Sequence, residues 1–295
     1  MRWLFLLAAV VVSPASPQQQ AGPVAVDFHN VNFHVAPGVT MEVRDLQGAL
    51  VSTRAGASPT FDDVGSYRLR IDAGEIAMST GSLTNLLNGR VFNYRGTPIS
   101  NVKITIEGTQ VKQTGTLHKG VPVPFTIMGD LSTTDDGRIR VRPASVKTAG
   151  IPAGGLMKLL HIELDDLVKS NPSRGFETTD NNLLLAPDRL LPEPRIAGHL
   201  TSVRIEGDRI VQTFGRSPSR ATGAVHNYMH YRGNVLRFGR LTMHDTELQL
   251  IDNDQQDPFE FSPAGYLKQL VAGYSKTAAD GRLRVYMPDF DAVDR

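Results

Sequence analysis

Three histidines in the C-terminal third of the 295-residue chain, His226, His230 and His244, are residues that could bind a metal ion. On the strand pattern of this region, His226 and His230 share a face but stand roughly 13 Å apart, too far to chelate one ion. A helix would bring them together, but the intervening Asn-Tyr-Met does not favour a helix. No glutamate adjoins His226 as a zinc-hydrolase helix requires. We therefore predict surface or packed histidines and no metal site.

Paired acidic residues are a second possible source of chemistry. They occur at Asp62-Asp63, Asp135-Asp136, Asp165-Asp166 and Asp252-Asn-Asp254. Neighbours on a strand point to opposite faces, which is the wrong geometry for a carboxylate pair, and the EF-hand pattern of calcium loops is absent. Turns and solvated helix ends are the better interpretation.

Nucleophile and phosphate motifs are also missing. The chain has no Gly-x-Ser-x-Gly elbow and no Ser-x-x-Lys at a predicted helix start. Gly154-Gly155 could hold an anion at a helix N-terminus, but glycines after Pro152 are more typical of a hinge. An enzyme would need a cluster assembled from distant segments, for example His199 with Asp208. We predict no catalytic residues and no cofactor.

The composition bounds the partners. With 31 basic and 30 acidic residues, nothing indicates a surface for polyanions, so we expect no nucleic-acid partner. The chain has no cysteine, which excludes disulfides and a lipoprotein anchor. A hydrophobic fraction of 40% over this length is enough for a large core, in one large or two medium domains.

The N-terminal residues predict export. Arg2 is followed by an apolar run from Trp3 to Val12 and then by small residues at Ser13-Pro14-Ala15, as in a cleaved secretory signal over residues 1–15. No later segment has the length of a transmembrane helix, so membrane contact would be peripheral or through bound lipid. We expect a periplasmic or secreted protein of a bacterial envelope.

The elements that would position any site are mostly strands. Apolar residues alternate at Val24, Val26 and Phe28, and the phase then slips to Val31 and Phe33, which predicts one strand with a bulge at residues 29–30 or two short strands. Between residues 101 and 142, turns at residues 107–108, 119–120 and 136–137 predict a four-stranded meander.

Two prolines interrupt the third strand of this meander. Pro122 and Pro124 sit between Val121, Val123 and Phe125, which would line one face of the strand. Residues two apart direct their N–H groups to the same edge, so the prolines remove donors from one edge only. We interpret this edge as an open seam that cannot recruit other strands. Any edge strand could use proline in the same defensive way without a ligand.

Two helices could cover the meander, a short one at residues 82–87 and an amphipathic one at residues 154–168. The Pro/Gly/Ser-rich stretch at residues 215–223 predicts a boundary. It would separate a domain of residues 24–215 from a mixed β/α extension or cap of residues 216–295. In that part, Ser262 and Pro263 indicate the start of a helix.

The predicted fold class is thus α+β and β-dominated, with a curved antiparallel sheet rolled around or covered by one or two amphipathic helices. Such a sheet can pack solidly or form a half-tube with an apolar lumen. The side chains expected to line that groove lie on the strands and on the longer helix: Ile104, Ile106, Val123, Phe125, Ile127, Leu156, Leu160 and Leu164.

The order of a short helix at residues 82–87, sheet strands, Asp136-Gly-Arg-Ile-Arg-Val-Arg-Pro143, Gly150-Ile-Pro152 and a leucine-rich helix resembles the LmeA-like phospholipid-binding proteins. These are exported bacterial relatives of the tubular lipid-binding superfamily, and the resemblance covers residues 24–215. It implies a rolled sheet, an apolar groove, and binding or movement of phospholipid or another acyl-chain ligand. No site residue carries over from the family.

Two functions remain open from the sequence. The first is an exported envelope protein that binds or shuttles phospholipid-like molecules in an apolar groove. The alternative is a non-enzymatic structural or interaction module of the envelope, with the aromatic-containing segment 228–238 as its docking surface.

Overall fold

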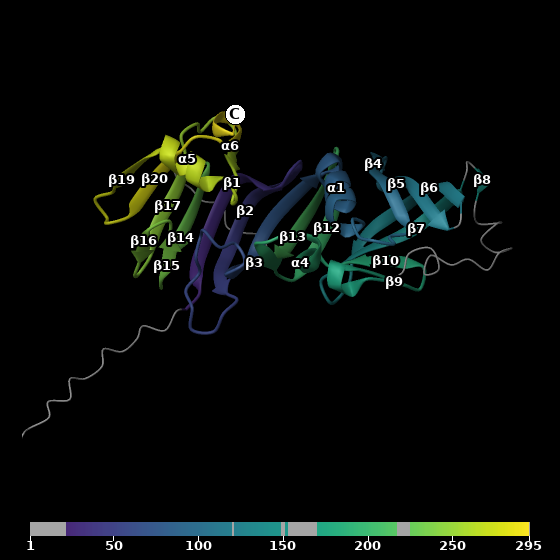
Figure 1. The fold of residues 1–295 in the computed structure, drawn as a ribbon, viewed down its shortest axis with the longest axis horizontal. Helices are drawn as coiled ribbons and strands as arrows, with labels where there is room; N and C mark the ends of the chain where they lie inside the picture. The colour runs from purple at the N-terminus through teal and green to yellow at the C-terminus, as the bar shows by residue number, and fades with distance from the viewer. Residues whose placement is uncertain (1–21, 120, 149–150, 153–169, 217–224, 295) are drawn as a thin grey trace, which may run out of the picture.

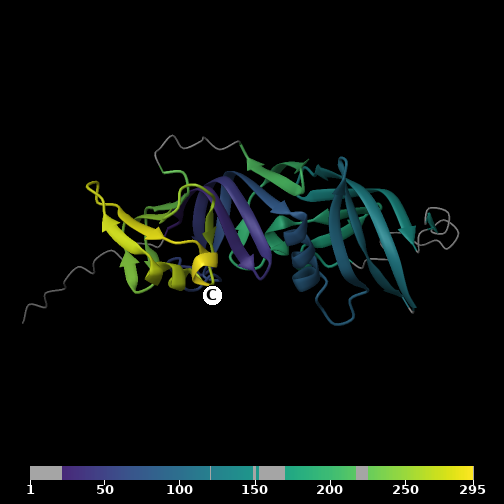
Figure 2. The same cartoon turned by 90° about the horizontal axis from the view of Figure 1, so that it is seen from above.

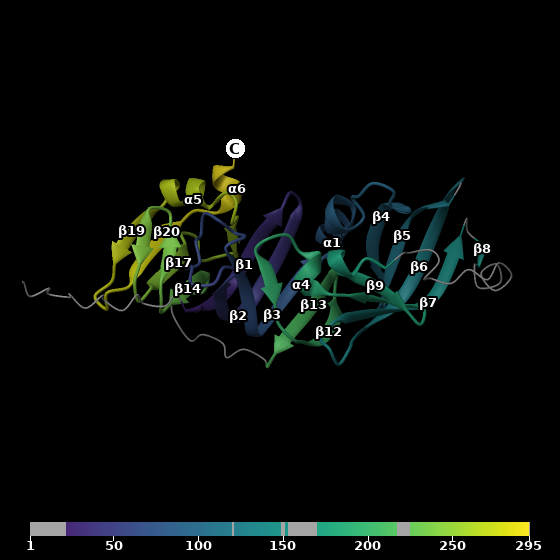
Figure 3. The same cartoon turned by 60° about the horizontal axis from the view of Figure 1, so that its bottom comes forward.

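A computed structural model describes residues 22–119, 121–148, 151–152, 170–216 and 225–294. The fold is β-dominated, with two large, mainly antiparallel sheets that do not close into a barrel (Figure 1). The molecule is elongated. The C-terminal strands lie at one end and the strands β4 to β8 at the other, with α1 between the two sheets (Figures 2 and 3).

The larger sheet has eleven strands and includes both the first strand and the last. In spatial order these are β12 (Leu200–Glu206), β13 (Arg209–Gly215), β3 (Tyr67–Ser79), β2 (Val39–Ser52), β1 (Val24–Ala36), β14 (Tyr228–Arg232), β17 (Glu247–Asp252), β20 (Leu283–Met287) and β19 (Tyr274–Thr277). Two short strands join in parallel, β11 (Arg195–Ala197) to β3 and β18 (Phe259–Phe261) to β1. The C-terminal segment therefore extends the same sheet beyond β1.

β1 is one continuous strand with a change of phase at Asn30. Asn30 has a left-handed backbone conformation, with φ of 52°. At this residue β1 changes its neighbour from β14 to β18, while its pairing with β2 continues without a shift. Val31 and Phe33 therefore face the core again, as Val24 to Phe28 do in alternation.

The smaller sheet contains the meander predicted between residues 101 and 142, which is confirmed. Its seven strands are β4 (Ile99–Glu107), β5 (Gln110–Lys119), β6 (Val121–Thr133), β7 (Ile139–Thr148), β10 (Asn182–Leu185) and β9 (Phe176–Thr179), with β8 (Ile151–Pro152) paired to the end of β7. Consecutive strands from β4 to β7 are antiparallel.

The helices in the described part of the chain are short. They are α1 (Thr80–Leu86), the π-helical turn η1 (Leu87–Val91), the 3-10 turn η2 (Pro172–Arg174), α4 (Pro187–Leu190), α5 (Tyr266–Ala272) and α6 (Phe290–Val293). The short helix predicted at residues 82–87 corresponds to α1 and the start of η1. The helix predicted at residues 154–168 lies outside the described residues. Among the described helices, none has the length and apolarity needed to cross a bilayer.

The start predicted for the C-terminal helix is wrong by three residues. Ser262 does not cap it: its hydroxyl accepts a hydrogen bond from the Gly265 N–H in a preceding turn, and α5 begins at Tyr266. Ser262 and Pro263 lie in a tight turn that precedes the helix, since a serine hydroxyl can bond the backbone of a turn as well as that of a helix start. The helix then begins with Tyr266, whose side chain is buried in the core.

The apolar face of the larger sheet is filled at its C-terminal end by the protein's own aromatic residues. Phe61 is at the centre, and its ring lies 5.0 to 6.5 Å from the rings of Tyr67, Tyr231, Phe238, Phe261 and Tyr266. The small sheet of β15 (Leu236–Phe238) and β16 (Leu241–Met243) contributes to this cover.

The interpretation of segment 228–238 as a docking surface is therefore wrong. Tyr228, Tyr231, Leu236 and Phe238 are buried. The aromatic residues that suggested an exposed patch complete the internal core instead, so the interaction-module alternative loses the surface on which it depended.

Candidate functional site

An apolar cavity lies where the two sheets meet, on the same face of the larger sheet as the aromatic cluster. Its volume is about 110 Å³. One wall comes from β2, β3, β11 and β13, the opposite wall from β4 to β7, β9 and β10, and α1, η1 and α4 close the sides. The lining residues are Met41, Ile76, Met78, Leu83, Leu86, Leu87, Val91, Phe92, Ile104, Val111, Gln113, Ile127, Leu131, Ile139, Val141, Phe176, Leu183, Leu185, Pro187, Leu190, Leu191, Ile196, Ile210, Gln212 and Phe214.

A second cavity of about 50 Å³ continues from the first along the inner face of the smaller sheet. It extends toward the end of that sheet farthest from the larger one, and it is lined by Phe92, Ile99, Gln113, Leu117, Phe125, Ile127, Val141, Pro143, Val146, Thr148 and Leu183. Phe92, Gln113, Ile127, Val141 and Leu183 line both. We call the two spaces together the two-lobed cavity, with lobe 1 at the sheet junction and lobe 2 beyond it.

The chemical character of the two-lobed cavity is uniform. Among the described residues that line it, the polar side chains are Gln113, Gln212 and Thr148, and none is titratable. The lining offers no acid, base, nucleophile or metal ligand. What it offers is exclusion of water and dispersion contact, which favour a hydrocarbon ligand.

The sequence-predicted groove residues divide into three groups. Ile104 lines lobe 1, Phe125 lines lobe 2 and Ile127 lines both. Ile106 and Val123 are half-buried and line neither lobe. Leu156, Leu160 and Leu164 lie outside the described residues.

The edge prolines lie near the end of β6, where the strand leaves its second neighbour. Pro122 pairs with His118 and Pro124 with Thr116, both on β5. On the other side, the pairing of β6 with β7 begins only at Phe125, opposite Thr148. In the described part of the chain, the proline segment is thus paired along one side.

α1 and η1 are fixed between the sheets by hydrogen bonds at both ends. The Ser79 hydroxyl caps α1 by accepting from the Ser82 N–H, and the Ser82 hydroxyl accepts from Thr40 N–H of β2. Asn88 exchanges two hydrogen bonds with the backbone of Val102 on β4. These bonds satisfy the edge of β4 and orient the apolar side of the helix into lobe 1.

Several lobe 1 residues were not predicted from the sequence. They are Ile76, Met78, Ile196, Ile210 and Phe214 from the larger sheet, and Phe176 and Leu190 from the segment after residue 170. Except for Leu190, which lies in α4, each has the inward position of a strand, which is a local signal. The signal did not show that two distant sheets would face one space.

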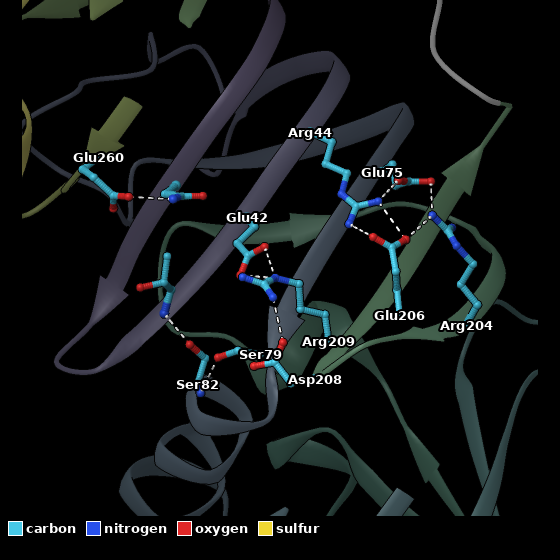
Figure 4. Close-up of polar contacts among 12 residues, drawn as sticks. Glu42, Arg44, Glu75, Ser79, Ser82, Arg204, Glu206, Asp208, Arg209 and Glu260 are labelled. Carbon is cyan, nitrogen blue, oxygen red and sulfur yellow. Dashed lines mark hydrogen bonds and ion pairs between the residues drawn. The ribbon is translucent and has the colours of Figure 1, made fainter. Parts of the chain in front are cut away.

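The outer face of the larger sheet carries a network of ion pairs, behind the wall of lobe 1 (Figure 4). Arg44 contacts Glu75 at 2.8 Å and Glu206 at 2.5 Å, and Arg204 contacts the same two carboxylates at 2.9 and 3.3 Å. The hydrogen bonds from Arg44 lower the pKa of Glu206. Since every carboxylate in this group is paired with arginine, the network joins β2, β3 and β12 and contains no free acid or base.

Two clusters in the described residues place three possible metal ligands within reach of one another. They are His34, Glu260 and Asp291, and Asp252, Asp257 and Asp289. His226, His230 and His244 belong to neither, and His230 contacts Glu247 at 2.9 Å. Asp252, from the acidic run noted in the sequence, accepts hydrogen bonds from Asp254 N–H and the Asn227 amide, so internal partners already satisfy it.

Comparison with protein families, with curated proteins and with solved structures finds no match for this chain.

Proposed function

We propose that this protein binds the hydrocarbon chain of a lipid in the two-lobed cavity. The observation that carries the proposal is the continuous lining, which joins two sheets and a helix and contains three uncharged polar side chains among its described residues. A protein that required only a stable core would gain by filling this space, because empty apolar volume costs stability.

The size of the lobes favours one chain at a time. Apolar cavities of about 150 Å³ accept a ligand the size of benzene. Lobes of about 110 and 50 Å³ in series would hold part of a single acyl chain, with the remainder outside the two lobes. Each methylene removed from water would contribute about 0.8 kcal/mol.

The setting we propose is a bacterial envelope, where the protein would act as a lipid-binding or lipid-shuttling component. Support comes from the signal-like residues 1–15 and from the resemblance to LmeA-like phospholipid-binding proteins. A rolled sheet covered by an amphipathic helix belongs to this proposal, with residues 154–168 as the proposed cover.

The test uses the junction of the two lobes. We expect the purified mature protein to bind a fluorescent fatty acid, and a natural lipid extracted from it to be detectable by mass spectrometry. Ile127→Trp and Leu183→Trp, on different strands, fill the junction and should each weaken probe binding by about tenfold or more, since each removes space for about two methylenes.

The matched control is Val271→Trp on α5, because Val271 is 84% exposed and far from the cavity. It should bind the probe as the wild type does. Circular dichroism and the unfolding midpoint identify a variant that fails to fold. Wild-type protein that binds no probe and yields no lipid would contradict the proposed function.

A further inference from the structure

Charge is distributed unevenly along the strands of the smaller sheet. Residues 99–148, which form β4 to β7 and the turns between them, contain seven basic residues (Lys103, Lys112, Lys119, Arg138, Arg140, Arg142 and Lys147) and four acidic ones (Glu107, Asp130, Asp135 and Asp136). Glu107 is the last residue of β4, next to the turn into β5, and Asp135 and Asp136 lie in the turn between β6 and β7. Both turns are at the end of the strands that lies near the larger sheet. The opposite end of β4 to β7, which we call the far end, has no acidic residue from these four strands.

The outer face carries two exposed lysines between the middle of β4 and the far end of β7. Lys103, Thr114, Thr126 and Lys147 form one register row across β4 to β7, on the face opposite Ile104, Gln113, Ile127 and Val146 of the cavity. Lys103 and Lys147 are exposed. Beyond this row lies His118, also exposed, which is hydrogen-bonded to Ser100 at 2.7 Å.

The far end also has an exposed apolar tip, formed by the first residues of β6. Val121 is 71% exposed, although it lies on the alternating series that includes the cavity residues Phe125 and Ile127. Pro122 and Pro124 beside it have no N–H to leave unsatisfied. A strand end entering a bilayer interface is costly mainly because its backbone donors lose water, so the prolines reduce that cost.

Lobe 2 ends at the same place. Its lining includes Leu117 on β5, Phe125 on β6 and Thr148 on β7, and each of these lies within a few residues of the far end of its strand. A hydrocarbon chain that left lobe 2 in this direction would emerge beside Val121.

From these four observations we infer that the far end of the smaller sheet docks on an anionic lipid surface, with Val121 inserted at the interface and Lys103 and Lys147 toward the head groups. The inference rests on the proposed function, since it makes lobe 2 the route by which a chain passes between the bilayer and the cavity. Basic residues are attracted to anionic lipid over about a Debye length, and an apolar side chain adds affinity on contact.

The experiment is vesicle flotation of the full mature chain, with vesicles of phosphatidylcholine alone and of equal parts phosphatidylcholine and phosphatidylglycerol. We expect binding to the anionic vesicles that weakens as salt is added. Val121→Asp should reduce that binding roughly tenfold or more, and Lys147→Ala should reduce it roughly fivefold.

The control is Val271→Asp, which makes the same change of charge at an exposed valine at the other end of the molecule. It should float as the wild type does. Equal binding by wild type and Val121→Asp, or equal losses for Val121→Asp and Val271→Asp, would overturn the inference. Fatty-acid probe binding in solution is measured on the same proteins. If Val121→Asp still binds the probe but floats poorly, the defect lies in docking on the membrane. If the wild type binds no probe, the result counts against the proposed cavity function and not against docking.

Discussion

Asp252 is a buried carboxylic acid at the end of β17, in the C-terminal part of the larger sheet. It is 1% exposed, and burial raises its pKa to about 7. Hydrogen bonds from Asp254 N–H and the Asn227 amide act in the opposite direction, and the nearby carboxylate of Asp289 raises the pKa further. The pKa of Asp289 is itself raised by burial.

This environment predicts a pH dependence of stability. The pKa of Asp252 is about 7 in the folded protein and about 4 in the unfolded chain, so the folded state holds the proton more tightly. The stabilisation is fully present below about pH 4 and is lost as the pH rises through about 7. The urea midpoint of the wild type should fall between about pH 5 and about pH 8, and that of Asp252→Asn should fall less. Equal slopes for the two proteins would contradict this.

For single residues, alternation of apolar side chains in the sequence correctly predicted some of the residues that line the cavity and failed for others. Ile104, Phe125 and Ile127 line the cavity as their positions indicated. Val121 is on the same series but is exposed, because β6 extends beyond the last residue of β7 with which it pairs in the described part of the chain. Periodicity gives the face of a strand, and burial depends also on whether a neighbour reaches that far.

At the scale of elements, the pairing of β2 with β3 depends on a glycine. The register shifts between Gln47 and Gly48, and a Cβ added to Gly48 would lie 1.9 Å from the backbone carbonyl oxygen of Arg70. The carbonyl belongs to the adjacent strand of the sheet and cannot rotate away as a side chain could. Only glycine allows the two backbones to approach at this point.

Gly48→Ala should therefore destabilise the protein by about 2 kcal/mol or more, as overpacking against backbone does. Gly89→Ala is the control. Gly89 lies in the helical turn η1, and a Cβ added there has no neighbouring atom within 4 Å. It should change stability by less than about 1 kcal/mol, in the stabilising direction. Urea unfolding of both variants measures the difference, and similar midpoints would show that the β2 backbone can adjust.

Local signals predicted the elements better than their ends. The turn residues at 107–108 and 136–137 correctly predicted the meander, because each of its strands pairs with the next strand in the sequence. Ser262 and Pro263 misplaced the start of α5, since the same residue types serve a tight turn and a helix cap. The helix at residues 154–168 lies outside the described residues and stays a prediction.

At the scale of the whole molecule, the C-terminal strands complete the core of the first strands. β14 pairs with β1 along its first half, and Tyr231, Leu248 and Phe261 are almost fully buried on the shared face. The alternation of residues 24–35 and of the C-terminal segment could be read separately, but their pairing could not. No local pattern specifies which strand, some two hundred residues away, will complete a sheet.

A chain that ends after residue 216 should accordingly fail to form a stable fold. It would expose the edge of β1 and leave Phe61 without four of its five ring neighbours, Tyr231, Phe238, Phe261 and Tyr266. Loss of a cooperative thermal transition, with aggregation on size-exclusion chromatography, is the expected result. A soluble, cooperatively folding product with intact probe binding would show instead that the smaller sheet and its junction form an independent unit.

The central position of β1 also has a kinetic consequence. Its neighbours on one side are β14 and β18, which follow it by about two hundred residues or more. The native contact order is correspondingly high, and loop closure over that separation precedes the gain from pairing. The sheet therefore cannot be completed while the polypeptide is still emerging from the ribosome. A chain built this way would stay unfolded for longer after synthesis, and this is compatible with the export that we propose, since a translocated chain passes in an extended state.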